Sequence, residues 1–195
     1  MLIDDRQRVP VTIFAGARGV GKTTTILRLL NAKPEAERWT VIIDELGRTM
    51  PDPGVLAANG ISIRGAPYGC PCCTGNTPMR VVLGRAVRET RPQRVILEVP
   101  WGSHLGNVVT LFEDPLIANV LSLAAVVAVV DQRSLNEGIL AASLVDLLGP
   151  AGVIVVTGSG PLSSLAIRAL RDHQNRCILI GPENPDVGVL LKSSA

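Results

Sequence analysis

Residues 16–23 have the sequence Gly16-Ala17-Arg18-Gly19-Val20-Gly21-Lys22-Thr23, which matches the pattern G-x-x-x-x-G-K-T of a phosphate-binding P-loop. The apolar, β-branched run 9–15 precedes this stretch and predicts a buried strand, and residues 24–30 predict a helix. A strand, a glycine-rich loop and a helix in this order are the context that the motif requires. The sequence therefore predicts a site for the phosphates of a nucleotide.

The residue types of the motif indicate how such a site would work. Glycines let the backbone curl and direct successive N–H groups inward, and the start of a helix adds a partial positive charge. We expect Lys22 to reach the β- and γ-phosphates, the Thr23 hydroxyl to ligate Mg²⁺, and Thr24 to donate to the α-phosphate. The predicted nucleotide-binding residues are Gly16, Gly19, Val20, Gly21, Lys22, Thr23 and Thr24.

Composition restricts the class of protein. The chain has 195 residues, of which 47% are apolar, 18% charged and 3% aromatic, so one domain spanning 1–195 with an aliphatic core is expected. The net charge is +2 and no basic stripe with interleaved aromatics occurs, so nucleic acid is not an expected partner. The polar start, 1–8, lacks a signal core, and the apolar run 121–130 is too short to cross a bilayer. We expect a cytoplasmic protein.

Strand patterns alternate with helix patterns along the chain. Further strands are predicted at 39–45, 60–64, 94–99, 123–130, 152–157 and 176–180, and further helices at 77–91, 107–121, 135–148 and 162–172. The segment 46–59 predicts a loop with at most one helical turn. This alternation predicts an α/β fold, a three-layer P-loop NTPase domain with a mainly parallel sheet flanked by helices.

Acidic residues end three of the predicted strands, at Asp44 and Glu45, at Glu98 and at Asp131, and we expect them at the sheet edge where ligands of parallel α/β domains gather. Glu98 ends an apolar strand, where it would hold Mg²⁺ through a water or orient an attacking water, unless it only caps the next helix. Asp44 and Glu45 end another strand. They would join the Mg²⁺ shell, position water or ligate a second metal, or else form a solvated strand end.

Cys70, Cys72 and Cys73 place three thiols within four residues. Such a cluster suits Zn²⁺ or Cu(I), and we expect an open site that Asp44, Glu45 or a partner chain completes. The C-x-x-C spacing of Cys70 and Cys73 leaves redox chemistry as an alternative, and packing is a third. Cys177 falls in a predicted core strand, where a small buried side chain is expected.

With these segments in order, the chain resembles the CobW/UreG/HypB family of P-loop GTPases, especially its CobW-like branch. The resemblance lies in the P-loop, the segment Ile42-Ile43-Asp44-Glu45-Leu46-Gly47, the Glu98 strand, and Gly69-Cys70-Pro71-Cys72-Cys73, which is similar to that branch's G-C-x-C-C signature. It implies a nucleotide-driven metallochaperone or metal-insertion accessory protein, with GTP as fuel, zinc or cobalt as cargo, a client metalloprotein, and a nucleotide-dependent homodimer.

Three departures from the family's pattern limit what the resemblance implies. The guanine-reading N-K-x-D motif, whose Asp accepts from the guanine N1–H and exocyclic amine, is replaced by Thr157-Gly158-Ser159-Gly160, so GTP and ATP both remain open. The E-x-x-G switch is replaced by Glu98-Val99-Pro100-Trp101-Gly102, so hydrolysis is expected to be slow or lost. Arg48 stands where an acidic residue is expected, and the C-terminal accessory domain of longer members is not expected in this chain.

The sequence therefore predicts a P-loop NTPase that handles a transition metal. In its catalytic site Lys22, Glu98 and Asp44 would act on the γ-phosphate, and Cys70, Cys72, Cys73 and Glu45 would hold the transition metal. Three alternatives remain: a non-hydrolysing, nucleotide-gated binding or regulatory module, an ATP-dependent small-molecule kinase, and a thiol redox protein.

Overall fold

The computed structural model describes residues 8–43, 51–66, 77–100, 105–138, 147, 149–172 and 176–180. These residues form a seven-stranded sheet in the order β3-β2-β4-β1-β5-β6-β7, and each neighbouring pair is parallel. The strands are β1 (Val9–Gly16), β2 (Trp39–Ile43), β3 (Ile61–Gly65), β4 (Arg94–Pro100), β5 (Leu121–Asp131), β6 (Val153–Thr157) and β7 (Arg176–Ile180). The central strand β1 leads directly into the P-loop.

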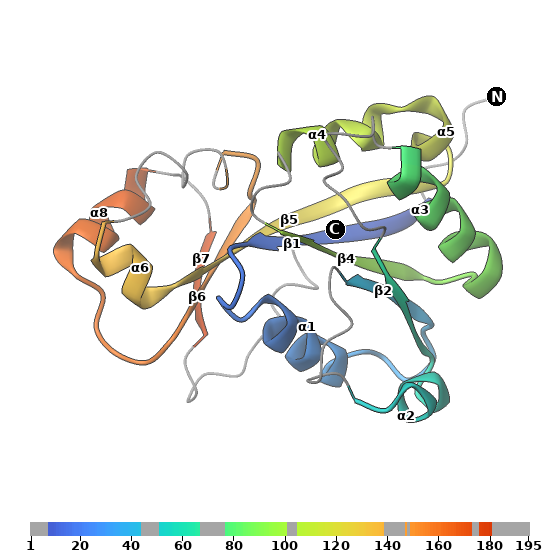
Figure 1. The fold of residues 1–195 in the computed structure, drawn as a ribbon, viewed down its shortest axis with the longest axis horizontal. Coiled ribbons are helices and arrows are strands. Elements are labelled where there is room, and N and C mark those ends of the chain that lie inside the picture. The colour runs from blue at the N-terminus through green and yellow to red at the C-terminus, as the bar shows by residue number, and fades with distance from the viewer. Residues whose placement is uncertain are drawn as a thin grey trace.

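Helices cover both faces of this sheet (Figure 1). They are α1 (Lys22–Asn31), α2 (Pro53–Ala58), α3 (Thr77–Thr90), α4 (Leu105–Thr110), the 3₁₀ helix η2 (Leu111–Glu113), α5 (Pro115–Ala118), α6 (Gln132–Asn136) and α8 (Ser164–Asp172). Figure 1 shows α1 and α2 on one face and α3, α4 and α5 on the other. Among the described residues, no helix is both long and apolar enough to cross a membrane.

Side chains of the inner strands alternate between two aliphatic cores. Val11 and Ile13 of β1 belong to the core under α3, α4 and α5, whereas Phe14 belongs to the core under α1 and α2. In β4, Leu97 packs into the first core and Ile96 into the second. Strands covered on both faces are continuous apolar runs, as their sequences predicted. The predicted three-layer α/β fold is therefore confirmed.

The single helix predicted at 107–121 is wrong. The structure has α4, η2 and α5 in succession, and β5 already begins at Leu121. Pro115 explains the break, because it lacks an N–H and its ring opposes continuation of the preceding helix. The Asp114 carboxylate accepts a hydrogen bond from the Leu116 N–H at 2.9 Å and caps a new helix, with Pro115 at its first turn.

A short helix, α6, begins at Gln132, directly after β5, because Asp131 caps it: Oδ1 accepts from the Ser134 N–H at 2.9 Å and Oδ2 from the Ser134 hydroxyl at 2.6 Å. Of the helix predicted at 135–148, only the first two residues lie in α6. Helix α6 ends at Asn136, and Gly138 follows with a φ of 65°. Residues 139–146 lie outside the described part of the chain. The carboxylate at the end of β5 is thus engaged in helix capping.

Candidate nucleotide-binding site

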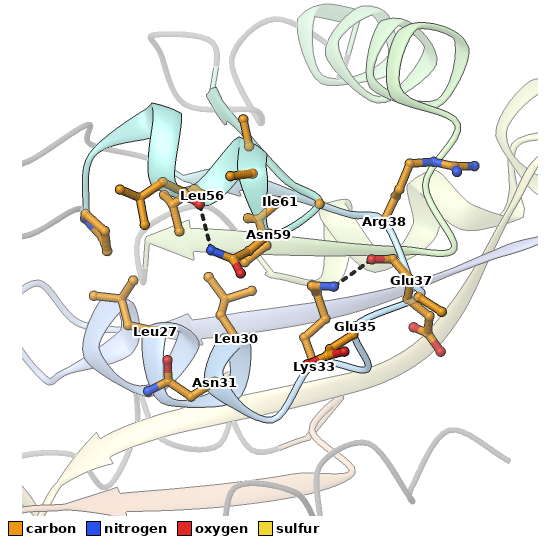
Figure 2. Close-up of a pocket in the computed structure, with 16 residues that line it drawn as sticks. Leu27, Leu30, Asn31, Lys33, Glu35, Glu37, Arg38, Leu56, Asn59 and Ile61 are labelled. Atoms are coloured by element: carbon orange, nitrogen blue, oxygen red, sulfur yellow. Dashed lines mark hydrogen bonds between the residues drawn. The ribbon is translucent and has the colours of Figure 1, made fainter.

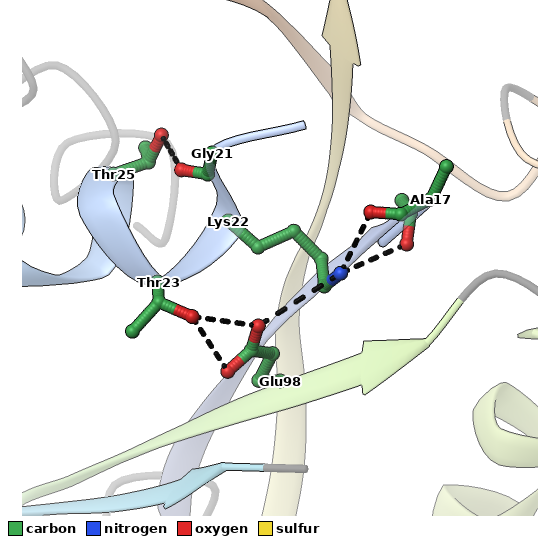
Figure 3. Close-up of polar contacts among 7 residues, drawn as sticks. Ala17, Gly21, Lys22, Thr23, Thr25 and Glu98 are labelled. Carbon is green, nitrogen blue, oxygen red and sulfur yellow. Dashed lines mark hydrogen bonds and ion pairs between the residues drawn. The ribbon is translucent and has the colours of Figure 1, made fainter. Parts of the chain in front are cut away.

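The P-loop joins the end of β1 to the start of α1, as Figure 3 shows. Gly19 and Gly21 have φ angles of 81° and 95°, in the left-handed region where glycine is favoured. Gly16 is required for a different reason: a Cβ on it would lie 2.2 Å from the Val129 carbonyl oxygen of β5. The motif's glycines are thus explained by loop curvature and by close packing of the loop on the sheet.

Lys22 is buried at the first position of α1, with only 7% of its surface exposed. Its Nζ donates to the carbonyl oxygens of Gly16 at 3.0 Å and Ala17 at 2.9 Å, and lies 3.8 Å from Glu98 Oε1 (Figure 3). The side chain therefore spans the loop from the helix start back to the strand end. A cation is held where the P-loop pattern predicts contact with phosphates.

Thr23 and Glu98 come together across the boundary between α1 and β4. The Thr23 hydroxyl lies 3.0 Å from Glu98 Oε1 and 3.2 Å from Oε2, and Glu98 is 6% exposed. Glu98 pairs in register with Phe14 of β1, and the strand alternation that puts Ile96 beneath α1 also puts Glu98 there. The structure thus gathers Lys22, Thr23 and Glu98 into one cluster, as the sequence predicted for the edge of the sheet.

The remaining predicted nucleotide-binding residues are Val20 and Thr24. Val20 is buried, and Thr24 is exposed on the first turn of α1. The next residue, Thr25, donates from its hydroxyl to the Gly21 carbonyl oxygen at 2.9 Å and reinforces that turn (Figure 3). Thr24 is therefore accessible to a ligand, whereas Thr25 is committed to the helix.

Sequence reasoning missed the contact that Thr157 makes with the P-loop. Its hydroxyl, at the end of β6, lies 2.6 Å from the Val20 carbonyl oxygen and 3.3 Å from that of Val130. Its Cγ2 would lie 3.3 Å from a Cβ placed on Gly21. The strand order brings β6 to this position, one strand beyond β5, and that order is not a local signal in the sequence. Thr157 thus braces the loop on the side opposite Glu98.

We expect Thr157→Val to lower the affinity for a nucleoside triphosphate about three- to tenfold and the free energy of unfolding by about 1 kcal/mol, because Val20 loses its hydroxyl donor. Nucleotide titration and urea unfolding measure the two effects. Thr110→Val is the matched control, since it removes a hydroxyl that donates to the Asn107 carbonyl at an exposed helix end. Unchanged nucleotide affinity in Thr157→Val would contradict the bracing role.

Several predicted site residues lie outside the described part of the chain. They are Asp44, Glu45, Cys70, Cys72 and Cys73, together with Arg48, Trp101 and Gly102 of the segments that depart from the family pattern. Cys177 lies in β7, of which the structure describes the backbone. The predicted transition-metal site therefore stays a prediction.

A groove of about 1000 Å³ lies between α1 and α2, away from the P-loop (Figure 2). Leu27, Leu30 and Leu56 form part of its apolar lining. Two of its polar side chains bond within the walls: Lys33 Nζ donates to the Glu37 carbonyl at 2.6 Å, and Asn59 Nδ2 donates to the Val55 carbonyl at 2.8 Å. These bonds stabilise the chain between α1 and β3, and we assign no ligand to the groove.

Comparison with known proteins agrees with this geometry. The model of the CobW/HypB/UreG nucleotide-binding domain matches residues 10–161. The zinc chaperone YeiR of Escherichia coli is 31% identical over 161 residues, which cover 82% of this chain and 49% of the relative. The chain thus spans about half the length of this curated relative.

Solved structures share the fold at lower identity. Zn(II)-bound YjiA GTPase from E. coli has a TM-score of 0.60 and 20% identity, covering 96% of this chain and 62% of that one. HypB from Helicobacter pylori, in complex with nickel, has a TM-score of 0.61 and 14% identity, covering 96% and 88%. With the matched P-loop and the Lys22–Thr23–Glu98 cluster in place, the chain belongs to the CobW/HypB/UreG family and contains its nucleotide-binding domain.

Proposed function

We propose that this chain is a nucleotide-gated metal carrier, which binds a Mg²⁺–nucleoside triphosphate at the P-loop and delivers a transition metal to a client metalloprotein. The observation that carries the proposal is the convergence of Lys22, Thr23 and Glu98 at the end of β1. The YeiR relative is named a zinc chaperone, which supports zinc as the cargo, with cobalt as the alternative.

The phosphates would be held by the loop amides and Lys22. The Lys22 ammonium now donates to two backbone carbonyls, of Gly16 and Ala17, at the mouth of the loop. Phosphate oxygens are stronger acceptors because they carry charge, so a bound triphosphate would replace one or both carbonyls as partners of Nζ. Lys22 would thereby neutralise charge on the transferring group while the loop keeps its shape.

The oxygen donors of Thr23 and Glu98 fit Mg²⁺, which prefers hydroxyl, carboxylate and phosphate oxygens together with water. Thr23 would hold the ion directly and Glu98 through a water or by accepting from the Thr23 hydroxyl. When bound, Mg²⁺ would neutralise charge on the β- and γ-phosphate oxygens. Glu98 is buried beneath α1, so its carboxylate would act from a fixed position.

Hydrolysis would proceed by direct attack of water on the γ-phosphorus, which releases the nucleoside diphosphate and inorganic phosphate. Glu98 or Asp44 would order the attacking water. A non-hydrolysing, nucleotide-gated module is the second candidate, and the altered segment Glu98-Val99-Pro100-Trp101-Gly102 favours it. A single-turnover measurement separates the two: bound triphosphate that stays intact for hours identifies the gated module, and release of phosphate identifies the NTPase.

The cargo site is proposed on Cys70, Cys72 and Cys73, with Glu45 or a partner chain completing it. Thiolates are soft ligands that suit Zn²⁺, and three of them leave a coordination position for transfer to a client. A nucleotide-dependent homodimer would bring two such sites together. The key experiment titrates the chain with GTP and ATP, each with and without Zn²⁺, and records affinity, hydrolysis and oligomeric state. Failure of every nucleotide to bind would overturn the proposal.

Metal stoichiometry provides a separate prediction. The chain should bind about one Zn²⁺ at micromolar concentration or tighter, as expected of a three-thiolate site. The triple variant Cys70→Ser, Cys72→Ser, Cys73→Ser should lose this binding when measured against a chromophoric chelator. Cys177→Ala is the matched control, because it removes the one cysteine outside the cluster. Unchanged stoichiometry in the triple variant would refute the cysteine site.

A further inference from the structure

The outward side of α3 presents a continuous surface away from the sheet (Figure 1). Four exposed residues of this helix are separated by three or four positions, which is the spacing of a single helix face. They are Val81, Gly84, Arg85 and Arg88, and we call them the α3 face. The opposite side of the helix packs into the core through Leu83 and Ala86. The core thus holds the helix in place, and its outer residues are accessible to a partner.

The α3 face carries positive charge that the described chain does not neutralise. Arg85 and Arg88 lie one helical turn apart. Glu89, the exposed acid next to them, is engaged elsewhere, because it pairs with Arg64 of β3 at 2.8 Å. Within the described residues, no ion pair involves Arg85 or Arg88. Both guanidinium groups are therefore available for carboxylates, with which arginine forms paired, parallel hydrogen bonds.

Gly84 makes a notch in the middle of the α3 face. A Cβ placed on it meets no atom within 4 Å, so packing within the described chain does not require a glycine there. Glycine inside a helix also destabilises the helix relative to alanine. Beside the notch, Val81 is 47% exposed and offers an apolar contact. Because the distance between packed helices depends on the side chains at the contact, the notch allows a second helix to approach closely.

The charge of the α3 face selects the kind of partner. A second copy of this chain, packed through the same face across a twofold axis, would bring the arginines of both copies together, and like charges repel. Nucleic acid does not fit, because no aromatic residue lies within α3 to stack on bases. A helix with carboxylates three or four positions apart and an apolar side matches both the arginines and the notch.

The α3 face also lies close along the chain to the proposed cargo site. Helix α3 begins at Thr77, and the four peptide links from Cys73 to Thr77 (77 − 73 = 4) span at most about 14 Å. A partner helix held on α3 would therefore be near the thiolates from which the metal is proposed to leave. This step, which identifies the partner as the client, rests on the proposed function.

We propose that the α3 face docks an acidic amphipathic helix of the client metalloprotein. Arg85 and Arg88 pair with carboxylates on successive turns of that helix. Gly84 and Val81 receive its apolar side. The client is then selected by charge and by shape, separately from the metal that it takes up.

Fluorescence anisotropy on the full chain tests the α3 face with two labelled peptides of about 20 residues, a length that supports an isolated helix. One peptide carries glutamates and leucines at helical spacing, and the other carries lysines in place of the glutamates. The glutamate peptide should bind with a dissociation constant of about 100 µM or tighter, and at least about tenfold more tightly than the lysine peptide. Its affinity should fall as the salt concentration rises, because the paired groups are exposed.

The double variant Arg85→Glu, Arg88→Glu should weaken binding of the glutamate peptide at least about tenfold, because attraction becomes repulsion. The matched control is Arg168→Glu, Arg171→Glu, which reverses two exposed arginines at the same spacing on α8 and should leave the affinity within about twofold. Gly84→Leu tests the notch separately. Its Cβ meets no atom of the described chain within 4 Å, so the variant should fold, yet it should bind the peptide at least about fivefold more weakly.

Equal affinity for the two peptides, absence of binding at about 1 mM, or an equal loss in the α8 control would each rule out the α3 face as an acidic docking site. Tighter binding of a single-stranded oligonucleotide than of the glutamate peptide would rule it out as well. The titration requires neither nucleotide nor Zn²⁺, so failure of those ligands to bind overturns the proposed function alone. The comparison of the two peptides on the wild-type chain decides the question even if a variant fails to fold.

Discussion

Replacing Lys22 by methionine should weaken the binding of a Mg²⁺–nucleoside triphosphate at least about 100-fold, or about 2.7 kcal/mol. Methionine keeps the length and apolar stem of the side chain but removes the ammonium. The expected loss is that of one or two charge-assisted hydrogen bonds to phosphate oxygens, each of which contributes about 1.5–3 kcal/mol. Isothermal titration with GTP and with ATP measures the change.

Lys33→Met is the matched control for this substitution. Lys33 Nζ also donates to two backbone carbonyls, of Pro34 at 2.7 Å and Glu37 at 2.6 Å, but it lies in the groove between α1 and α2 (Figure 2). Loss of the Lys33 ammonium should leave the nucleotide affinity within about twofold of the wild-type value, because no phosphate is expected in this groove. An equal loss of affinity in both variants would show that Lys22 acts only by holding the backbone.

The architecture could be predicted from the sequence because its signals are local. A strand buried on both faces, such as β4, is a continuous apolar run, and the P-loop motif fixes the strand, loop and helix around it. Glu98 could be selected for the same reason, since an acid that ends such a run lies at the ligand-binding edge. Its contact with Thr23 follows from the pairing of β1 with β4.

Boundaries and long-range contacts could not be predicted in the same way. The apolar spacing of 107–121 continues through Pro115, and the cap at Asp114 that begins a new helix is a competing local signal. The hydrogen bond between Thr157 and Val20 joins residues 137 positions apart and depends on the strand order.

Gly16→Ala should have the largest effect on the fold itself. The new Cβ would lie 2.2 Å from the Val129 carbonyl oxygen and 3.1 Å from the Val20 side chain. The first neighbour is backbone of the adjacent strand β5, which cannot move without separating β1 from β5. We expect the free energy of unfolding to fall by about 3 kcal/mol or more, at or above the upper end for an overpacked core. Urea unfolding, followed by circular dichroism, measures this change.

Gly84→Ala provides the matched control with the opposite sign. Gly84 lies within α3, and a Cβ placed on it meets no atom within 4 Å. Alanine there should raise the free energy of unfolding by about 0.5–1 kcal/mol, because it lowers the conformational freedom of the unfolded chain and favours the helix. The same methyl group therefore stabilises the protein at one glycine and destabilises it at the other. Equal stability of Gly16→Ala and the wild type would mean that β1 and β5 are not packed as closely as described, and the geometry of the P-loop entrance would have to be revised.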